Sequence, residues 1–496
     1  MQAIDLQKFI YQFSYHSNEP LLFNSAFFFY FFLLFLLVYR LVYNTGLTRI
    51  LVLTLFSLYF FYKACGWYVG LIVLSAIIDF SLSNLIYKTE KPWNRKLLLI
   101  LSLVLNLGML AYFKYTNFFI GLMNDVQGGQ IPLLKLVLPV GISFYTFENI
   151  SYTIDVYRKQ FKPVNNFWDY LFFLSFFPKL MMGPIVRAAD FIPQIRKNVE
   201  LTARDVSEGL FLILTGCFKK IVISDFLTLN LVNYVFDDPA RHTGLECLFA
   251  TYGYALVIYC DFSGYSDMAI GMARWMGIKL DRNFSAPYQS SNITEFWRRW
   301  HISLSSWLKD YLYIALGGSR KGQARRYINL IITMVIGGFW HGASWNFLFW
   351  GAAHGVALAF DKIRMNLFGI KESKAIDRGI SWRRIPGILI TFHFVCLLWI
   401  FFKAETFEGS RIMINQIVTN FSPETWPAFF ANYHSVIWLM LTGIVLHFLP
   451  LSWNERIINF VTPSHWSVKA IIATAVIFVI LQFKLAETVL PVYLQF

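Results

Sequence analysis

Apolar stretches about as long as a lipid bilayer is thick recur along the whole chain and constrain its fold more than any other feature. A helix needs about 20 mainly apolar residues to cross the hydrocarbon core. Such stretches can be read at 21–43, 47–62, 67–86, 97–122, 167–182, 206–223, 245–272, 327–340, 344–360, 385–402, 435–451 and 468–483. Only 15% of the 496 residues are charged, against roughly 25% in soluble chains. We therefore expect an all-α polytopic membrane protein with about 11–13 transmembrane helices, forming one domain over residues 1–496.

Some of these stretches are too short or too interrupted for a full crossing. The stretch 327–340 is short, and the apolar run 133–150 is broken by Pro139 and Gly141. Backbone groups freed by such breaks are tolerated only where protein or a water-filled cavity satisfies them. We therefore also expect re-entrant or amphipathic helices.

The net charge of +14 is explained by membrane topology. The loop 87–96 carries Lys88, Lys91, Arg95 and Lys96 against Glu90 alone, so we expect it to be cytoplasmic. The basic loops are expected to meet membrane lipid or an anionic cytosolic substrate, not nucleic acid.

Several common chemistries lack support in the sequence. The five cysteines are scattered without a C-x-x-C pair, and there is no phosphate-binding loop, dinucleotide fingerprint or H-E-x-x-H motif. No disulfide framework, metal site or bound cofactor is indicated.

One histidine lies within the otherwise apolar, aromatic or small segment 337–345. A titratable side chain out of water is costly and marks a functional site by default. Small residues at Gly337, Gly338, Gly342 and Ala343 are expected to clear space around His341 for a bulky substrate. His341 is therefore the first candidate for a catalytic base.

A second histidine lies in the segment 291–313, which reads as an amphipathic helix with Thr294 as its N-cap. Helical spacing places one set of residues on a common apolar face: Trp297, His301, Leu304, Leu308 and Tyr311. Arg298 and Lys309 fall on another face. We expect His301 to point into the protein and these cations to point toward water or phosphate.

Other polar residues in apolar surroundings have two open interpretations. His354, His393 and His447 are either satisfied structural donors or functional groups. Asp261 and Asp267 are expected chiefly to pair with cations or hydroxyls and to fix a helix break at Gly264. A role in orienting an imidazole stays open for them.

Five motifs together resemble the membrane-bound O-acyltransferase family, in its bacterial alginate O-acetyltransferase branch. They are PVGISFYTF at 139–147, FPKLMMGPIVR at 177–187, DFSGYSD at 261–267, FWRRWHISLSSWL at 296–308 and GFWHGASW at 338–345. The motif-bearing core covers about residues 132–362, and the aromatic tail at the end of the chain fits as well. The resemblance implies a multi-pass bacterial inner-membrane protein with a central tunnel. It also implies a cytosolic acyl donor, an acceptor reached from outside, and catalytic roles for His341 and His301.

The residues suit acyl transfer from a thioester, which needs a base, donors for an oxyanion and a site closed to water. His341 supplies the base. His301 or a nearby indole is expected to donate to the oxyanion or hold the substrate; these indoles belong to Trp297, Trp300, Trp340 and Trp345. The expected donor is acetyl-CoA, whose phosphates would be held by Arg298, Arg299, Lys309, Arg320 and Lys321. Anchoring to anionic lipid is the alternative role of these cations.

No serine elbow or Gly-Asp-Ser hydrolase signature is present. An extracytoplasmic acyl-transfer partner of the SGNH-hydrolase type is therefore expected. The acceptor stays open among alginate, another exopolysaccharide, peptidoglycan and a teichoic acid that receives D-alanine. A transporter or flippase is the rival class, but the inverted repeat typical of it is not found. A purely structural export scaffold would need neither imidazole.

Overall fold

The computed structural model describes residues 6–16, 19–370, 379, 381–484 and 489–494, and every regular element within them is helical. The chain forms two compact units. The first contains Met1–Asp205 and Ala269–Asp281, and the second contains Val206–Met268 and Arg282–Phe496. The long helix α12 (Gly244–Trp275) belongs partly to each unit. The expected all-α class is confirmed.

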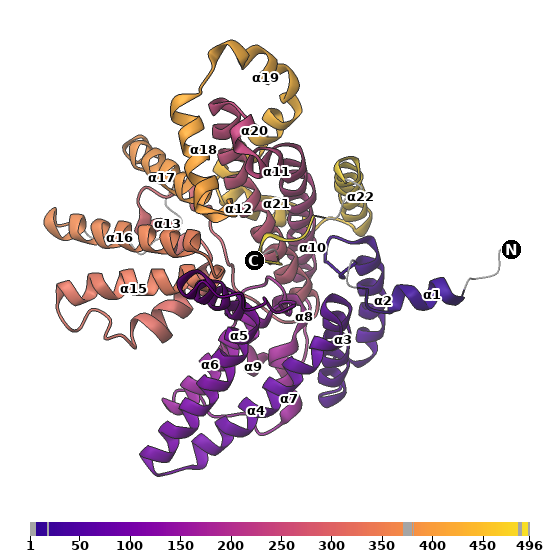
Figure 1. Cartoon of the computed structure of the whole chain (residues 1–496). Helices are drawn as coiled ribbons and strands as arrows, with labels where there is room; N and C mark the ends of the chain where they lie inside the picture. The colour runs from indigo at the N-terminus through magenta and orange to yellow at the C-terminus, as the bar shows by residue number, and fades with distance from the viewer. Residues whose placement is uncertain (1–5, 17–18, 371–378, 380, 485–488, 495–496) are drawn as a thin grey trace. The chain divides into compact units, whose positions relative to one another are not determined.

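In the first unit α4 packs against α5, α6 and α7 (Figure 1). Its helices are α1 (Leu6–Phe13), α2 (Ala26–Val42), α3 (Leu47–Cys65), α4 (Val69–Lys88), α5 (Pro92–Gln127), α6 (Ile142–Tyr157), α7 (Phe167–Ser175), α8 (Phe177–Leu180) and α9 (Ala188–Ile195). The expected break in the run 133–150 is confirmed, because α6 begins only after Gly141. This glycine has φ 72°, and a Cβ there would lie 2.4 Å from the carbonyl oxygen of Leu180, so no other residue fits.

The second unit carries every residue predicted for the site. Besides most of α12 and α10 (Ala203–Cys217), its helices are α11 (Asn233–Asp237), α13 (Ile293–Arg299), α14 (Ile302–Trp307), α15 (Gln323–His341), α16 (Trp345–Leu367), α17 (Ile385–Lys403), α18 (Phe407–Thr419), α19 (Trp426–Asn432), α20 (His434–Phe448), α21 (Ser452–Val461) and α22 (Trp466–Phe483). Helices α15 and α16 lie side by side (Figure 1). Three stretches of the described residues are π-helical: Phe218–Asp225 directly after α10, Thr228–Val232 directly before α11, and Leu308–Tyr313 directly after α14.

Fewer helices than expected are long and apolar enough to cross a membrane. In the described residues these are Leu47–Lys88, Pro92–Gln127, Gly244–Trp275, Trp382–Lys403 and Trp466–Phe483. A sixth would be the pair Pro423–Asn432 and His434–Phe448, which is bent by 82°. By helix length and apolar composition the described residues therefore supply five or six spans, fewer than the predicted 11–13. Breaks explain part of the difference: the stretch 167–182, for example, is divided at Phe176, where the backbone leaves the helical conformation between α7 and α8.

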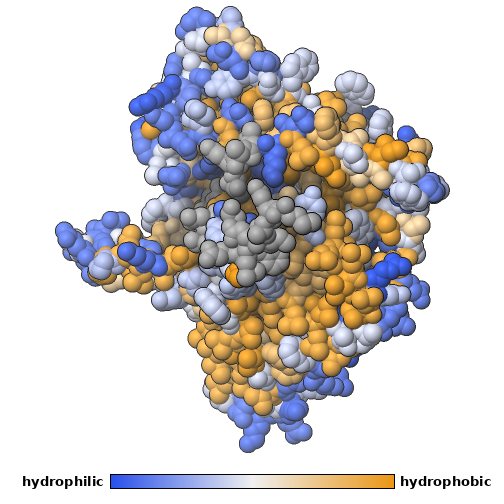
Figure 2. Space-filling model, turned by 90° about the vertical axis from the view of Figure 1, so that its right-hand side faces the viewer, coloured by the Kyte–Doolittle hydropathy of each residue, from blue (hydrophilic) through white to orange (hydrophobic). Residues whose placement is uncertain are grey.

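Large apolar side chains cover much of the surface. Leu41 is 80% exposed, Val126 78% and Trp466 72%. Figure 2 shows apolar residues gathered in continuous areas of the surface. Exposed apolar areas of this extent need lipid or another apolar partner. Together with the long apolar helices they define a multi-pass membrane protein.

Candidate functional site

His341 ends α15 and is 5% exposed. Aromatic rings surround its imidazole; their centroids lie at 4.8 Å for Trp340, 5.0 Å for Phe402, 5.2 Å for Trp350 and 5.4 Å for Tyr493. The ring therefore sits in apolar, aromatic surroundings, as the sequence predicted.

The small residues beside His341 do not clear a pocket, which corrects the prediction. A Cβ on Gly338 would lie 2.3 Å from the carbonyl oxygen of Phe347, and a Cβ on Gly342 would lie 2.2 Å from the ring of Phe347. Gly337 has more room, with Leu308 at 3.3 Å. These glycines let α15 and α16 approach closely, and that packing fixes the position of the imidazole at the helix end.

The helix expected over 291–313 is broken at His301. Helix α13 ends at Arg299 and α14 begins at Ile302, and His301 between them adopts left-handed φ 42° and ψ 59°. The predicted N-cap is also wrong: the side chain of Asn292 caps the helix, whereas the hydroxyl of Thr294 donates to Asp361 at 2.5 Å. Helical phase therefore does not orient His301. Its expected interior position is nevertheless confirmed, because the residue is fully buried.

The hydrogen bond of His301 fixes its tautomer. Its Nδ1 lies 3.1 Å from Oδ1 of Asn283, and the backbone N–H and hydroxyl of Ser303 also donate to that oxygen. The oxygen can only accept, so Nδ1 carries the hydrogen. Burial lowers the pKa of His301, which keeps the ring neutral and leaves a lone pair on Nε2. Nε2 is buried and has no hydrogen-bond partner among the described residues. The single N–H of a neutral His301 is therefore used by Asn283 and cannot donate to an oxyanion. Its Nε2 can accept a hydrogen bond or a proton.

Tyr493 connects the two histidines and was missed at the level of sequence. Its ring centroid lies 6.2 Å from that of His301, 5.4 Å from that of His341 and 4.4 Å from that of Phe262. The two imidazoles, which are 40 positions apart in the sequence, therefore flank one tyrosine ring. The sequence signalled this residue only through the aromatic tail that contributed to the family resemblance.

Tryptophans and His354 extend the aromatic site. Nε1 of Trp297 donates to Nδ1 of His354 at 3.2 Å. Trp350 contacts the rings of both His354, at 4.7 Å, and His341, at 5.2 Å. Trp350 is 1% exposed, and its Nε1 has no hydrogen-bond partner within the described part of the chain. Sequence reasoning did not select Trp350, because nothing local separates it from the other fifteen tryptophans.

The four predicted tryptophans have different environments. Trp340 and Trp297 contact the site directly, whereas Trp300 is buried against Phe284 and Trp399. Trp345 is 62% exposed, so its expected place in the pocket is wrong. It stands at the first turn of α16 with its ring turned outward, a direction that composition alone does not determine.

The two aspartates pair with lysines. Lys220 reaches Asp261 at 2.5 Å, and Lys219 reaches Asp267 at 2.6 Å. This confirms the pairing favoured from the sequence. The expected break at Gly264 is wrong: α12 runs on through Gly264, which instead approaches Gly216 closely.

The other two histidines of uncertain role differ in burial. Nδ1 of His393 lies 2.8 Å from the carbonyl oxygen of Leu389, four residues back in its own helix, and the residue is exposed. His447 is buried, and its Nε2 accepts from the backbone N–H of Tyr288 at 3.1 Å.

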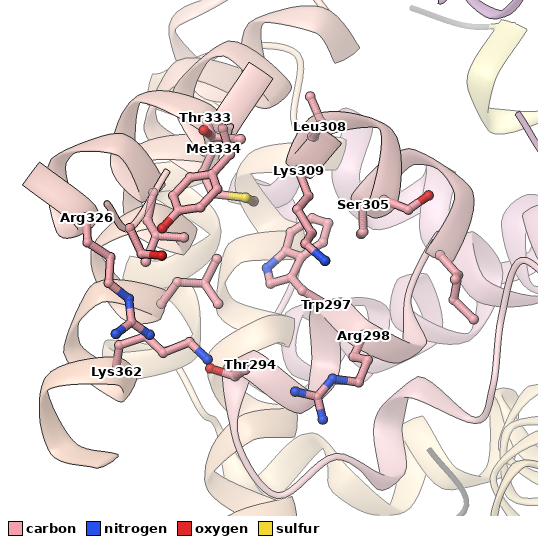
Figure 3. Close-up of a pocket in the computed structure, with 16 residues that line it drawn as sticks. Thr294, Trp297, Arg298, Ser305, Leu308, Lys309, Arg326, Thr333, Met334 and Lys362 are labelled. Carbon is pink, nitrogen blue, oxygen red and sulfur yellow. The ribbon is translucent and has the colours of Figure 1, made fainter. Parts of the chain in front are cut away.

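A cavity of about 580 Å³ lies on the other side of Trp297. Four cations, several hydroxyls and apolar residues line it: Thr294, Trp297, Arg298, Ile302, Ser305, Ser306, Leu308, Lys309, Tyr313, Ser319, Arg326, Leu330, Thr333, Met334, Leu358 and Lys362. Figure 3 shows Arg326 and Lys362 on one side of the cavity and Arg298, Lys309 and Trp297 on the other.

The predicted phosphate-binding cations separate into two groups. Arg298 and Lys309 line the cavity, while Arg320 and Lys321 are exposed and lie outside its lining. Arg299 is buried and bonds Glu295 at 2.7 Å, so it serves the structure.

Glu295 also bonds Arg384 at 2.6 Å. Burial alone would raise the pKa of Glu295, but hydrogen bonds from Ser291 and the guanidinium groups of Arg299 and Arg384 hold it below its usual value. Arg326 on α15 and Lys362 on α16 do line the cavity but were not among the cations predicted to hold phosphate, because only the packing of α15 and α16 beside α13 brings them there.

The comparisons with known proteins agree with this architecture. The family model of the membrane-bound O-acyltransferases matches residues 9–401. The chain is 36% identical to the peptidoglycan O-acetyltransferase of Helicobacter pylori, over 74% of this chain and 73% of the relative. It is 39% identical to a probable alginate O-acetylase of Pseudomonas aeruginosa, over 72% and 66%, and 26% identical to the teichoic acid D-alanyltransferase of Bacillus subtilis, over 70% and 92%. The chain therefore belongs to the membrane-bound O-acyltransferase family and is an O-acyltransferase.

Proposed function

We propose that this protein transfers an acetyl group from a cytosolic thioester to a hydroxyl of an extracytoplasmic polysaccharide. One observation carries the proposal. Two buried imidazoles flank a single ring in dry, aromatic surroundings, and a cation-lined cavity lies against a wall of the same site at Trp297. A reactive thioester needs the dry aromatic surroundings, which protect it from hydrolysis. Its anionic carrier needs the cations of the cavity, which can bind phosphate.

His341 acts as the base. It takes the proton of the acceptor hydroxyl as the oxygen attacks the thioester carbonyl carbon, and the C–S bond of the resulting tetrahedral intermediate breaks. The proton on His341 then passes to the departing thiolate, so the imidazole ends neutral. Nε2 of His301 accepts a hydrogen bond from a second hydroxyl of the acceptor and so orients the acceptor, because the fixed tautomer leaves Nε2 able only to accept. The buried N–H of Trp350, beside His341, donates to the oxyanion.

The donor is acetyl-CoA, held as a substrate and not as a resident cofactor. Its phosphates bind Arg298, Lys309, Arg326 and Lys362, and the thioester arm reaches past Trp297 toward His341. Cytosolic entry follows from where acyl-CoA thioesters are found. A purely lipid-anchoring role for these cations would leave the KM for the donor independent of them.

The relatives favour acetyl over D-alanyl transfer. Identity is 36–39% to enzymes named for O-acetylation and 26% to the enzyme named for D-alanyl transfer. All three act on polymers outside the cytoplasm, so we place this protein in the bacterial cytoplasmic membrane. An extracytoplasmic partner of the SGNH-hydrolase type would complete delivery to the polymer.

Mass analysis of surface glycans tests the proposal. Exopolysaccharide and peptidoglycan would be isolated from cells that contain the protein, lack it, or carry His341→Ala. We expect ester-linked acetyl groups to disappear from one fraction without the protein and to return with the wild type but not with the variant. Unchanged acetylation of both fractions would contradict the proposal.

A further inference from the structure

A buried charge cluster lies where the π-helical stretch Phe218–Asp225 meets α12. A Cβ on Gly216 would lie 2.5 Å from the carbonyl oxygen of Gly264, so the two backbones nearly touch. One turn further, Nζ of Lys220 lies 2.5 Å from Asp261 and 2.7 Å from Asp225. We call these three residues the Asp261 cluster.

The Asp261 cluster binds the backbone of the segment Val489–Tyr493 at two points. The N–H of Val492 donates to Oδ2 of Asp261 at 2.7 Å, and Nζ of Lys220 donates to the carbonyl oxygen of Val489 at 3.4 Å. The side chains of Lys220 and Asp261 are 0% and 1% exposed. Two carboxylates face one ammonium, so the N–H of Val492 supplies the additional donor that a buried carboxylate requires.

The residue after Val492 is Tyr493, whose ring packs against both His301 and His341. We infer that the Asp261 cluster is a positioning device for acyl transfer: it holds the segment Val489–Tyr493 so that the ring of Tyr493 closes the space between the two imidazoles. This inference rests on the proposed function.

A purely structural ion pair could take its additional donor from any neighbouring backbone, whereas this donor belongs to the segment that carries Tyr493 to the site. The π-helix is a second indication, because such irregular turns occur frequently at functional sites. By filling the space between the imidazoles, the segment excludes water, so the thioester meets the acceptor hydroxyl and is not hydrolysed.

Two substitutions at Val492 separate the backbone bond from the side chain. Val492→Pro removes the N–H donor, and Val492 is the first residue of the short helix Val492–Leu494, a position that accepts proline. Val492→Ala keeps the donor and loses only apolar bulk. The assay uses the full-length protein in detergent or vesicles and measures acetyl transfer together with thiol release from acetyl-CoA in the absence of acceptor.

We expect Val492→Pro to lower transfer about tenfold or more, since small misplacements at a reacting centre are costly. Its ratio of hydrolysis to transfer should rise, while Val492→Ala should stay within about twofold of wild type. Equal transfer and equal hydrolysis in the two variants would overturn the inference.

A second pair covers the case in which Val492→Pro does not fold. Asp261→Asn and Asp261→Leu both lose the ion pair with Lys220, but only Asp261→Asn keeps an acceptor for the N–H of Val492. Transfer should be higher in Asp261→Asn, and hydrolysis relative to transfer should be higher in Asp261→Leu. Identical ratios would contradict the positioning role. His341→Ala separates a failure of the positioning role from a failure of the proposed function. If His341→Ala remains active, the catalytic assignment is rejected, whatever the Val492 and Asp261 variants do.

Discussion

Two neighbouring regions of the second unit share Trp297 but have opposite chemistry. Around His341 and His301 the surroundings are aromatic rings and closely packed glycines. On the other side of Trp297 the cavity is lined by four cations and several hydroxyls. A single substrate with an uncharged reactive end and an anionic carrier end suits this pair of environments. The contrast predicts that substitutions in the first region change kcat and those in the second change KM.

The largest effect is expected for His341→Ala. Loss of a positioned general base typically lowers the rate roughly 100- to 10,000-fold. The variant should express and stay monodisperse in detergent while transferring almost no acetyl group. His393→Ala is the matched control, because His393 is exposed, its described hydrogen bond is to Leu389 of its own helix, and its ring contacts Tyr252 and not the site. Near wild-type activity of His341→Ala would reject its role as the base.

His301→Ala should lower kcat substantially but leave measurable activity. The imidazole of His301 orients a hydroxyl through Nε2 and is not the base. Removing it should therefore lower kcat less than removing His341 does, on the order of 10- to 100-fold. Asn283→Leu should reproduce part of the defect, because it frees the tautomer of His301. If His301→Ala proved more severe than His341→Ala, with both proteins folded, the two roles would have to be exchanged.

Cations in the cavity should affect donor binding. Lys309→Ala and Arg326→Ala should each raise the KM for acetyl-CoA about 3- to 10-fold with little change in kcat, as expected for partly solvated phosphate contacts. The KM for acetylpantetheine, which lacks the phosphates, should not move. Arg320→Ala serves as the control, because Arg320 lies outside the lining of the cavity. An unchanged KM for both donors would favour a role of these cations in lipid anchoring.

The smallest predicted change is in stability, at two glycines of the dry region. Gly338→Ala places a Cβ against backbone atoms of α16 and should destabilise the protein by about 1–3 kcal/mol. Gly337→Ala meets only the flexible end of Leu308, and its midpoint of thermal unfolding should hardly change. Equal unfolding midpoints for the two variants would show that α15 and α16 are not closely packed there.

Local sequence signals predicted one part of this molecule well. The apolar stretches gave the all-α membrane class, and Pro139 and Gly141 gave the break before α6, because these signals act within a few residues. Burial of His301 and His341 was predicted from their apolar neighbours. The pairing of Asp261 and Asp267 with cations followed from the cost of an uncompensated carboxylate in an apolar setting.

Tertiary features were not accessible in this way. Tyr493 lies beside the two histidines on a segment that bonds a distant part of the chain: the N–H of the preceding residue, Val492, donates to Asp261, 231 positions away. Trp350 and Trp345 lie on the same helix, yet one is buried beside His341 and the other is exposed. The left-handed backbone of His301 overrode a helical periodicity that looked continuous in the sequence. Glycines such as Gly338 and Gly342 can either leave open space beside His341 or let another helix approach closely. Only the position of α16 shows that they do the second.

Sidedness of transfer tests the central claim most directly. Inside-out vesicles that contain the protein and the acceptor would receive acetyl-CoA labelled in the acetyl group, with wild type, His341→Ala and His393→Ala compared. We expect label in the acceptor for wild type and His393→Ala and almost none for His341→Ala. Labelling only when the donor is supplied at the extracytoplasmic face, or undiminished labelling with His341→Ala, would contradict it.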